Sequence, residues 1–277
     1  MSFAWKQGAP KVAFITGGSS GIGFEFARLL AREGCSVAIF NRRLAPDAID
    51  ELQAEAASSQ QRFVSYAADV SDVDCLEAAI SSAVAEFGEP ELAINAAGVT
   101  VSKPFEALSA EDFNYVININ LVGSRNFASA VLPHLNKGSH LVLVSSIAGL
   151  VSNYAYAAYC ASKFGTVGLA AVLRLELKLK GIDVSVCCPA EINTPLVVAE
   201  RKTLHPVSAA LKDFVGTMEV EPACRSMMKQ IARRKFEIIP GAMARLSAIL
   251  NQHFPTLARW ISDVIARRAM NRYNQNQ

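Results

Sequence analysis

A glycine-rich turn near the start of the chain constrains the fold more than any other feature. Residues 11–16 have the apolar pattern of a short buried strand, residues 16–23 (Thr-Gly-Gly-Ser-Ser-Gly-Ile-Gly) follow at once, and a helical pattern covers 24–33. Glycines allow a tight turn and let backbone N–H groups and the positive end of a helix approach a pyrophosphate. The order strand, turn, helix therefore predicts a dinucleotide site, and an ordinary glycine-rich turn is the alternative.

The rest of the chain repeats the alternation of strand and helix. Because no linker or charge block divides the 277 residues, we expect one domain over 1–277. Alternating strands and helices are typical of a parallel sheet covered on both faces, so the fold class is α/β with a doubly wound sheet of about seven strands. The expected strands are 11–16, 36–40, 62–66, 91–95, 139–145, 182–188 and 236–239.

A second motif, in the middle of the chain, combines a serine, a tyrosine and a lysine. Ser146 precedes Tyr159, and Lys163 follows Tyr159 by one turn if 157–179 is helical, so the last two side chains share a helix face. The unperturbed pKa of tyrosine is about 10, and a nearby ammonium lowers it, which allows proton exchange near neutral pH. Tyr-x-x-x-Lys occurs by chance on many helices, so its weight depends on the glycine turn.

The two motifs together resemble the short-chain dehydrogenase/reductase family over roughly residues 10–195. The resemblance implies a Rossmann-type sheet and hydride transfer between a nicotinamide and a carbonyl carbon. Ala96 and Ala190 depart from the family pattern, in place of an asparagine and a glycine. The cofactor residues that the resemblance implies are Thr16, Gly17, Ser19, Ser20, Gly21, Ile22, Gly23, Asp69, Val70, Asn95, Ala96, Gly98, Tyr159, Lys163, Pro189, Ile192 and Thr194.

The same resemblance assigns a catalytic tetrad of Asn120, Ser146, Tyr159 and Lys163. Tyr159 would act as acid or base, and Ser146 would donate a hydrogen bond to the substrate oxygen. Lys163 would lower the pKa of Tyr159 and bind the nicotinamide ribose, while Asn120 would hold a water molecule. No metal is expected, because the four histidines are scattered without ligand spacing, and each is expected at the surface or in a loop.

The end of the second expected strand bears on the choice of cofactor. An acidic side chain there would bind the ribose 2′-hydroxyl of NAD and repel a 2′-phosphate. This chain has Asn41, Arg42 and Arg43 instead, and a guanidinium suits a phosphate. We therefore expect NADP(H) to be preferred over NAD(H); two solvated arginines at a strand end are the alternative.

Composition and the N-terminal residues bear on the compartment. The six cysteines show no metal spacing, and several fall in expected strands, which indicates reduced, buried thiols and a reducing cytosol. Residues 1–10 lack the apolar stretch of a signal peptide, so we expect a cytoplasmic protein. A homodimer or homotetramer is expected, and no nucleic-acid partner.

The C-terminal part is basic and partly apolar. Residues 222–277 contain ten Lys or Arg and two Asp or Glu, whereas the whole chain has a net charge of +2. We expect 241–277 to be a basic amphipathic helical extension that contacts an anionic membrane surface, or that packs on the domain or a second subunit. Residues 255–270 are similar to the tail of 3-ketodihydrosphingosine reductases, which reduce a long-chain ketone at the membrane. Residues 196–216 are expected to form a substrate-side loop.

Two classes of function remain open from the sequence. The first is an NADP(H)-dependent oxidoreductase acting on a ketone or secondary alcohol of a lipid or acyl chain, such as 3-ketodihydrosphingosine, with a steroid or a 3-oxoacyl thioester as alternative substrates. The second is a non-catalytic NADP(H)-binding redox sensor or scaffold, because a fold does not fix a function. The complete tetrad favours the enzyme, since a binder has no need of it.

Overall fold

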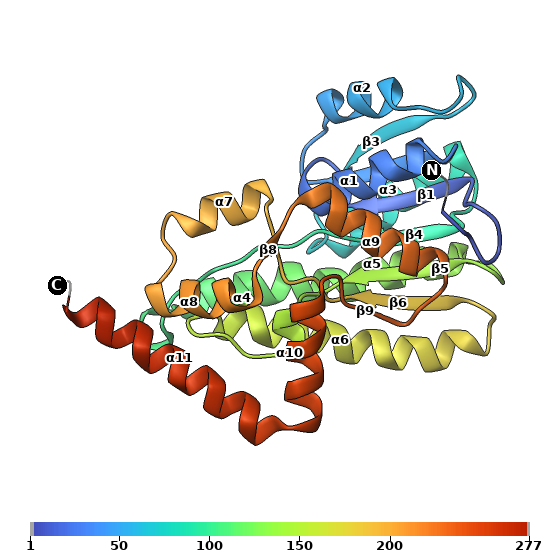
Figure 1. Ribbon diagram of the computed structural model, residues 1–277. Coiled ribbons are helices and arrows are strands. Elements are labelled where there is room, and N and C mark those ends of the chain that lie inside the picture. Colours follow the sequence, from blue (N-terminus) through green and yellow to red (C-terminus); the bar gives the residue numbers. More distant parts are fainter. Residues whose placement is uncertain (1–2, 276–277) are drawn as a thin grey trace.

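A parallel sheet with the strand order β3-β2-β1-β4-β5-β6-β9 forms the centre of the molecule (Figure 1). The computed structural model describes residues 3–275; residues 1–2 and 276–277, which the single-domain and C-terminal predictions include, lie outside the described residues. The strands of the sheet are β1 (Val12–Thr16), β2 (Ser36–Asn41), β3 (Phe63–Ala67), β4 (Leu92–Asn95), β5 (His140–Val144), β6 (Asp183–Cys187) and β9 (Glu237–Ile238). A separate pair joins β7 (Glu191–Ile192) to β8 (Thr217–Met218).

Helices cover both faces of the sheet because successive side chains of each buried strand point to opposite sides. Ala13 and Ile15 pack in the core with α1 and α9, while Phe14 packs in a second core with α3, α5 and α6. The predicted doubly wound, seven-stranded sheet is confirmed. The helices are α1 (Gly21–Ala31), α2 (Pro46–Ala54), α3 (Val73–Phe87), α4 (Ala110–Ile117), α5 (Gly123–Val131), α6 (Ala157–Lys178), α7 (Pro195–Arg201), α8 (Pro206–Val215), α9 (Val220–Ala232), α10 (Ala242–His253) and α11 (Pro255–Gln275).

The point where the strand order reverses positions the site. The chain runs outward from β1 to β3 and then returns to β4 on the other side of β1, so Thr16 and Asn95 lie opposite each other at the carboxyl ends of adjacent strands. Ligands of open α/β sheets bind in the crevice at such a reversal. The Thr16 hydroxyl donates to Asn95 Oδ1 and accepts from the N–H groups of Ala96 and Ala97, both at 3.2 Å, which joins the two strand ends.

The segment 196–216 is not the loop that the sequence analysis predicts. It is largely helical, in α7 and α8, because each helix has a proline in its first turn and a capping side chain before it. Thr194 Oγ1 accepts from the N–H of Val197 at 3.3 Å, and His205 Nδ1 accepts from the N–H of Val207 at 3.2 Å. These start signals are local to the segment, and they make it helical where a loop is predicted.

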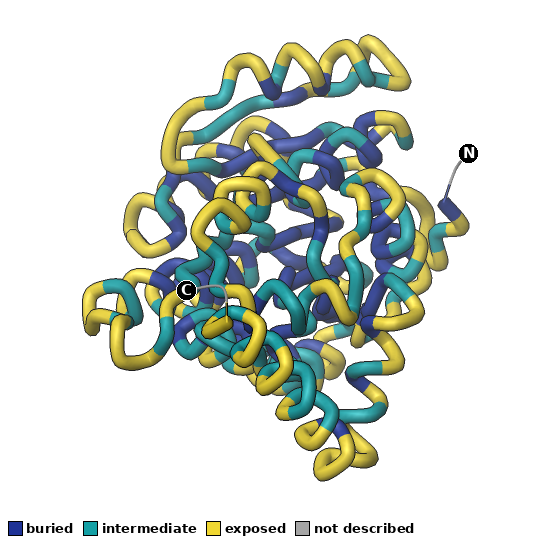
Figure 2. Tube along the Cα trace, turned by 60° about the vertical axis from the view of Figure 1, so that its left-hand side comes forward, coloured by how far each residue is buried: buried dark blue, intermediate teal, exposed yellow. Residues whose placement is uncertain are grey.

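The C-terminal segment forms two helices that leave the sheet layers (Figure 1). Pro255 separates them, because a proline inside a helix removes one backbone hydrogen bond and clashes with the preceding turn. α11 packs along α8, and its Tyr273 ring lies 5.4 Å from the ring of His205. Figure 2 shows that buried residues concentrate in the sheet and its covering helices, whereas this C-terminal pair is mainly exposed or intermediate.

One expectation about the histidines is wrong. His140 is buried in β5, where its Nε2 lies 2.7 Å from the Ser185 hydroxyl, and burial holds the pKa of its ring well below the ordinary value. Cys35, Cys187 and Cys188 are buried free thiols, as the strand pattern predicts. Within residues 3–275, no helix is both long and apolar enough to cross a membrane.

Candidate active site and cofactor cleft

The serine, the tyrosine and the lysine of the central motif converge where β5 ends and α6 begins. Ser146 follows β5 and caps a short 3₁₀ turn: its hydroxyl accepts from the N–H of Ala148 at 3.1 Å and donates to the Pro189 carbonyl at 3.4 Å. Tyr159 and Lys163 both lie on α6, one turn apart, with Lys163 Nζ 5.6 Å from the centre of the Tyr159 ring. The helix predicted over 157–179 therefore gives the two side chains the shared face that proton transfer requires.

The electrostatics of this site differ from the sequence-based expectation. Burial raises the pKa of the Tyr159 hydroxyl, a hydrogen bond with Ser146 lowers it, and the Glu200 carboxylate raises it. Burial also lowers the pKa of Lys163 to about 8, and its ammonium donates to the Val144 carbonyl at 3.1 Å. Burial, and not the Lys163 ammonium, therefore has the largest effect on the pKa of Tyr159, because desolvation penalises the charged form of both groups.

Asn120 belongs to the supporting frame of the site. It lies in a π-helical turn, η2 (Asn118–Val122), between α4 and α5, and such turns are frequent at functional sites. Its side chain accepts from the N–H of Val99 at 2.8 Å and donates to the Val99 carbonyl at 2.9 Å and to Ser162 Oγ at 3.1 Å. Asn120 thus ties the segment after β4 to α6, next to Lys163.

A cleft lies beside the glycine turn, where the backbone is open to close approach by a ligand. A Cβ on Gly17 would lie 2.9 Å from the Ala97 backbone, and one on Gly23 would lie 2.3 Å from the Gly17 carbonyl, so neither position admits a side chain. This close backbone approach leaves N–H groups and the start of α1 free for a pyrophosphate. Of the predicted cofactor residues, those that line this cleft are Gly17, Ser19, Asn41, Arg42, Asp69, Val70 and Gly98.

The residues after β2 suit a phosphorylated ribose. Asn41 Oδ1 accepts from the N–H of Ser19 at 3.1 Å, while Asn41 Nδ2 is buried and has no partner among the described residues. Arg42 and Arg43 are exposed, and within the described chain neither guanidinium takes part in a hydrogen bond or ion pair. A buried donor beside two free guanidinium groups fits a ligand with several acceptor oxygens.

The remaining predicted site residues either line a larger pocket or line neither space. Ala190 replaces the glycine of the family pattern, and its backbone can carry a side chain because its φ is not positive. Among the described residues other than glycine, only Ala155 and Arg234 have positive φ. The predicted residues in the larger pocket are Ile22, Ser146, Tyr159, Pro189, Ile192 and Thr194. Those that line neither space are Thr16, Ser20, Gly21, Gly23, Arg43, Asn95, Ala96, Asn120 and Lys163.

The larger pocket joins Ser146 and Tyr159 to an apolar wall. The wall comes partly from 196–216, the segment that the sequence analysis expects on the substrate side, and partly from the C-terminal extension. Its side chains include Leu196, Leu211, Phe214, Leu250, Ile261 and Ile265, from α7, α8, α10 and α11. A pocket lined by both polar side chains and an apolar wall fits an amphipathic ligand.

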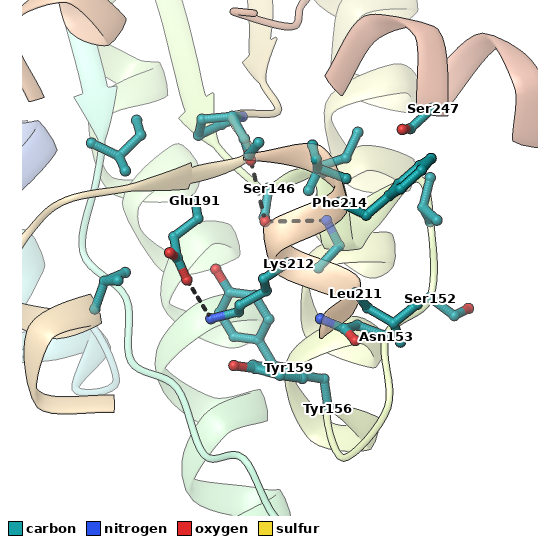
Figure 3. A pocket seen from close by; sticks show the side chains of 18 of the residues that line it. Ser146, Ser152, Asn153, Tyr156, Tyr159, Glu191, Leu211, Lys212, Phe214 and Ser247 are labelled. Atoms are coloured by element: carbon teal, nitrogen blue, oxygen red, sulfur yellow. Dashed lines mark hydrogen bonds and ion pairs between the residues drawn. The ribbon is translucent and has the colours of Figure 1, made fainter. Parts of the chain in front are cut away.

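Sequence reasoning missed a tyrosine and three charged residues of this pocket: Tyr156, Glu191, Glu200 and Lys212. Tyr156, Glu191 and Lys212 are labelled in Figure 3, where the side chains of Glu191 and Lys212 point toward each other. Lys212 Nζ lies 5.0 Å from the centre of the Tyr156 ring, which is 5.8 Å from that of Tyr159. The spacing of Tyr156 and Tyr159, three apart on one helix start, is the one signal that could have indicated a second tyrosine at the site. The charged residues are far apart in sequence and carry no such signal.

Comparisons with known proteins agree with this geometry. The family model described as short chain dehydrogenase matches residues 11–205. Two 3-dehydrosphinganine reductases of Arabidopsis thaliana, TSC10A and TSC10B, are 37% and 34% identical to this chain, covering 82% and 81% of it and 69% and 68% of their own length.

Among solved structures, a short chain dehydrogenase from Mycobacterium paratuberculosis bound to NAD has the same fold. Its TM-score is 0.75 at 24% identity, over 85% of this chain and 98% of its own. The resemblance stated from the motifs is confirmed, including the resemblance to ketosphinganine reductases. The chain belongs to the short-chain dehydrogenase family and is an oxidoreductase.

Proposed function

We propose that this protein is an NADP(H)-dependent reductase of a long-chain lipid ketone of the 3-dehydrosphinganine type. The observation that carries the proposal is the larger pocket, where Ser146 and Tyr159 lie at one end of an apolar wall that α8, α10 and α11 complete. The identity with two 3-dehydrosphinganine reductases supports the same substrate class. A short polar ketone would leave this apolar wall in contact with water, which costs free energy.

The proposed roles follow from the positions of the side chains. Bound NADPH would supply the hydride that reduces the carbonyl carbon. Ser146 orients the carbonyl through a hydrogen bond to its oxygen, and Tyr159 donates the proton that converts this oxygen into a hydroxyl. Lys163 ties α6 to the end of β5 through its hydrogen bond to the Val144 carbonyl. Asn120 holds the segment after β4 through its hydrogen bond with Val99.

The proposed cofactor preference rests on Asn41, Arg42 and Arg43. Arg42 lines the cleft beside the glycine turn, and both arginines are exposed at the carboxyl end of β2. In dinucleotide sites of this type, an acidic residue at the end of the second strand would bind the ribose 2′-hydroxyl of NAD. Two guanidinium groups instead attract the 2′-phosphate of NADP(H), which supports the preference over NAD(H).

A peripheral membrane contact of a cytoplasmic protein is part of the proposal. At the junction of α10 and α11, six large apolar side chains are exposed: Met243, Leu246, Ile249, Phe254, Leu257 and Trp260. Arg245 and Arg259 lie among them in the sequence, and Arg267, Arg268 and Arg272 follow. Apolar side chains next to basic ones favour an anionic lipid surface, from which a long-chain ketone would enter the pocket.

Self-association as a homodimer or homotetramer is proposed from a stripe on α6. Phe164, Val172, Leu175 and Leu179 are exposed, and their spacing puts them on one side of the helix. Exposed apolar stripes of this kind mark subunit contacts. A change of Leu175 to glutamate should shift the mass measured by light scattering from that of an oligomer toward that of one chain.

The proposed reaction is tested by following NADPH oxidation with 3-ketones of increasing chain length, with and without a 2-amino group. A steroid ketone and a 3-oxoacyl thioester serve as competing substrates. We expect kcat/KM to rise with chain length, because each buried methylene contributes about 0.8 kcal/mol. Equal rates for short and long ketones, or faster reduction of the steroid or the thioester, would contradict the proposed substrate class.

A further inference from the structure

The loop 150–156 connects the two side chains that are proposed to act on the substrate carbonyl. It begins after the 3₁₀ turn η4 (Ile147–Gly149), which Ser146 caps, and it ends at α6, which carries Tyr159. The loop consists of turns and irregular chain, so its conformation depends on contacts with other elements. The loop residues that line the larger pocket are Val151, Ser152, Asn153 and Tyr156.

Two side chains from the C-terminal half of the chain bind backbone carbonyls of this loop. The Leu150 carbonyl accepts a hydrogen bond from Asn251 Nδ2, on α10, at 2.8 Å. The Tyr154 carbonyl accepts one from the hydroxyl of Ser208, a fully buried residue on α8, at 2.7 Å. The loop is therefore held near its first residue by α10 and near its last residues by α8.

A row of three aromatic rings ties the same loop to α11. The centre of the Tyr154 ring lies 4.8 Å from that of His205, which lies 5.4 Å from that of Tyr273. Rings at these separations are in favourable contact. His205 Nδ1 also accepts from the N–H of Val207, which fixes the orientation of the middle ring. The contacts from α10 and α11 lie beyond residues 11–205, the part of the chain that the family model matches.

The loop keeps one residue in a strained backbone conformation. Ala155 has a φ of 60°, in the left-handed region that disfavours residues with a Cβ. Its carbonyl accepts from the N–H of Lys103 at 2.9 Å, and the side chain that follows, Tyr156, is buried. Strain of this kind persists only where the surrounding structure holds it in place. The contacts from α8, α10 and α11 therefore stabilise a loop conformation that the Ala155 backbone does not favour by itself.

We infer that Asn251 and Tyr273 are positioning residues for the reduction. They hold the loop 150–156 in the conformation that lets Ser146 and Tyr159 reach the same carbonyl oxygen. A displacement of about 1 Å at a reacting group costs about 100-fold in rate, so a loop that relaxes lowers turnover without removing any reacting group. The inference rests on the proposed roles of Ser146 and Tyr159, and it gives α10 and α11 a part in every turnover, whatever the length of the substrate.

The first test measures reduction of a short and a long 3-ketone by full-length Asn251→Asp with NADPH. An ionised aspartate has nearly the same shape but only accepts hydrogen bonds, so it repels the Leu150 carbonyl. We expect kcat to fall by about tenfold on both ketones, because the carbonyl loses its donor and the loop leaves its productive conformation. NADPH affinity should stay within about threefold, because neither Asn251 nor the loop lines the cofactor cleft.

Gln252→Glu is the matched control, because it puts the same charge on an exposed neighbour in the same helix. Its kcat should stay within about twofold of the wild type. Tyr273→Leu, which removes the outer ring of the row, should lower kcat by about threefold or more at unchanged NADPH affinity. Adding Ala155→Gly to Asn251→Asp should restore part of the lost kcat, because glycine adopts a positive φ without steric cost.

Several results would overturn the inference while ketone reduction stands. One is a wild-type kcat in Asn251→Asp or in Tyr273→Leu. Another is a parallel loss of NADPH affinity, which would show that these residues support the whole fold. A third is a double variant, Asn251→Asp with Ala155→Gly, that is no more active than Asn251→Asp alone. A wild type that reduces neither ketone would instead refute the proposed function itself.

Discussion

At the scale of single residues, the main energetic cost of the site is the burial of Lys163. Its side chain is surrounded by protein, its ammonium has one hydrogen bond, to the Val144 carbonyl, and burial lowers its pKa to about 8 from 10.5. Below pH 8 the folded protein must keep the charged form buried. As the pH rises from 8 to 10.5, the folded state loses this proton before the unfolded state does, so the cost is progressively relieved.

The first prediction is that Lys163→Met stabilises the protein at neutral pH while it abolishes activity. The lowered pKa corresponds to roughly 3 kcal/mol of unfolding free energy, reduced by the lost hydrogen bond. Urea unfolding should show that the variant's free energy of unfolding exceeds that of the wild type by the full amount below pH 8. This difference should shrink as the pH rises toward 10.5. A variant that is less stable than the wild type at every pH would contradict the assignment of a burial cost to Lys163.

The second prediction concerns Arg42 and Arg43, which are exposed at the end of β2. Replacing both by alanine should weaken NADPH binding by about 10- to 100-fold and NADH binding by less than about threefold, since a charged hydrogen bond contributes about 1.5–3 kcal/mol. Titration of each reduced cofactor by fluorescence measures this directly. Arg62→Ala, on an arginine outside the cleft, is the control, and an equal loss for the two cofactors would remove the pair from phosphate recognition.

At the scale of secondary-structure elements, α11 completes the wall of the substrate pocket. Ala258, Ile261 and Ile265 face the pocket, and α11 packs along α8, which carries Lys212 and Phe214. The helix thus connects the region proposed to meet lipid with the region proposed to hold the substrate chain. Its contribution should depend on the length of the substrate, because only a long chain reaches it.

The third prediction therefore uses the double variant Ile261→Asn with Ile265→Asn. It should lower kcat/KM for a long-chain ketone by about tenfold or more and leave a short ketone within about twofold, because a buried aliphatic side chain contributes about 1.5–3 kcal/mol. Asp263→Asn, an exposed change on the same helix outside the basic set, should affect neither substrate. Equal losses on both ketones would mean that α11 supports the fold and not the substrate.

The elements and the catalytic side chains differ in how far the sequence predicts them. Tyr159, Lys163 and the glycine turn lie in short local motifs, so their positions follow from helix and turn geometry. Glu191, Glu200 and Lys212 come from three separate elements, and only the tertiary fold brings them together. The helices of 196–216 are a different case, because their capping residues Thr194 and His205, each followed by a proline, are local signals in the sequence.

At the scale of the whole molecule, charge and exposed apolar surface are unevenly distributed. Ten of the chain's 27 Lys and Arg residues, but only two of its 25 Asp and Glu residues, lie in 222–277. Phe254 and Trp260, at the junction of α10 and α11, are 60% and 62% exposed. An anionic lipid surface would cover the apolar groups and attract the basic ones.

The fourth prediction is that the wild type sediments with anionic vesicles and that added salt weakens this binding. Leu257→Ser with Trp260→Ser should lower the bound fraction by about tenfold or more, since large apolar side chains contribute about 1.5–3 kcal/mol each. Phe105→Ser, on an exposed apolar residue away from both α6 and the C-terminal helices, is the control for lost apolar surface elsewhere. If the double variant binds vesicles as the wild type does, the junction of α10 and α11 is not the lipid contact.

The central claim, that Tyr159 drives reduction of a long-chain ketone, is tested most directly by Tyr159→Phe. The measurement is NADPH oxidation with a long-chain 3-ketone, together with NADPH binding to the same variant. We expect turnover to fall by about 10²–10⁴, the usual share of general acid–base catalysis, and NADPH affinity to stay within about threefold. A Tyr159→Phe protein that keeps most of the wild-type turnover would contradict the account.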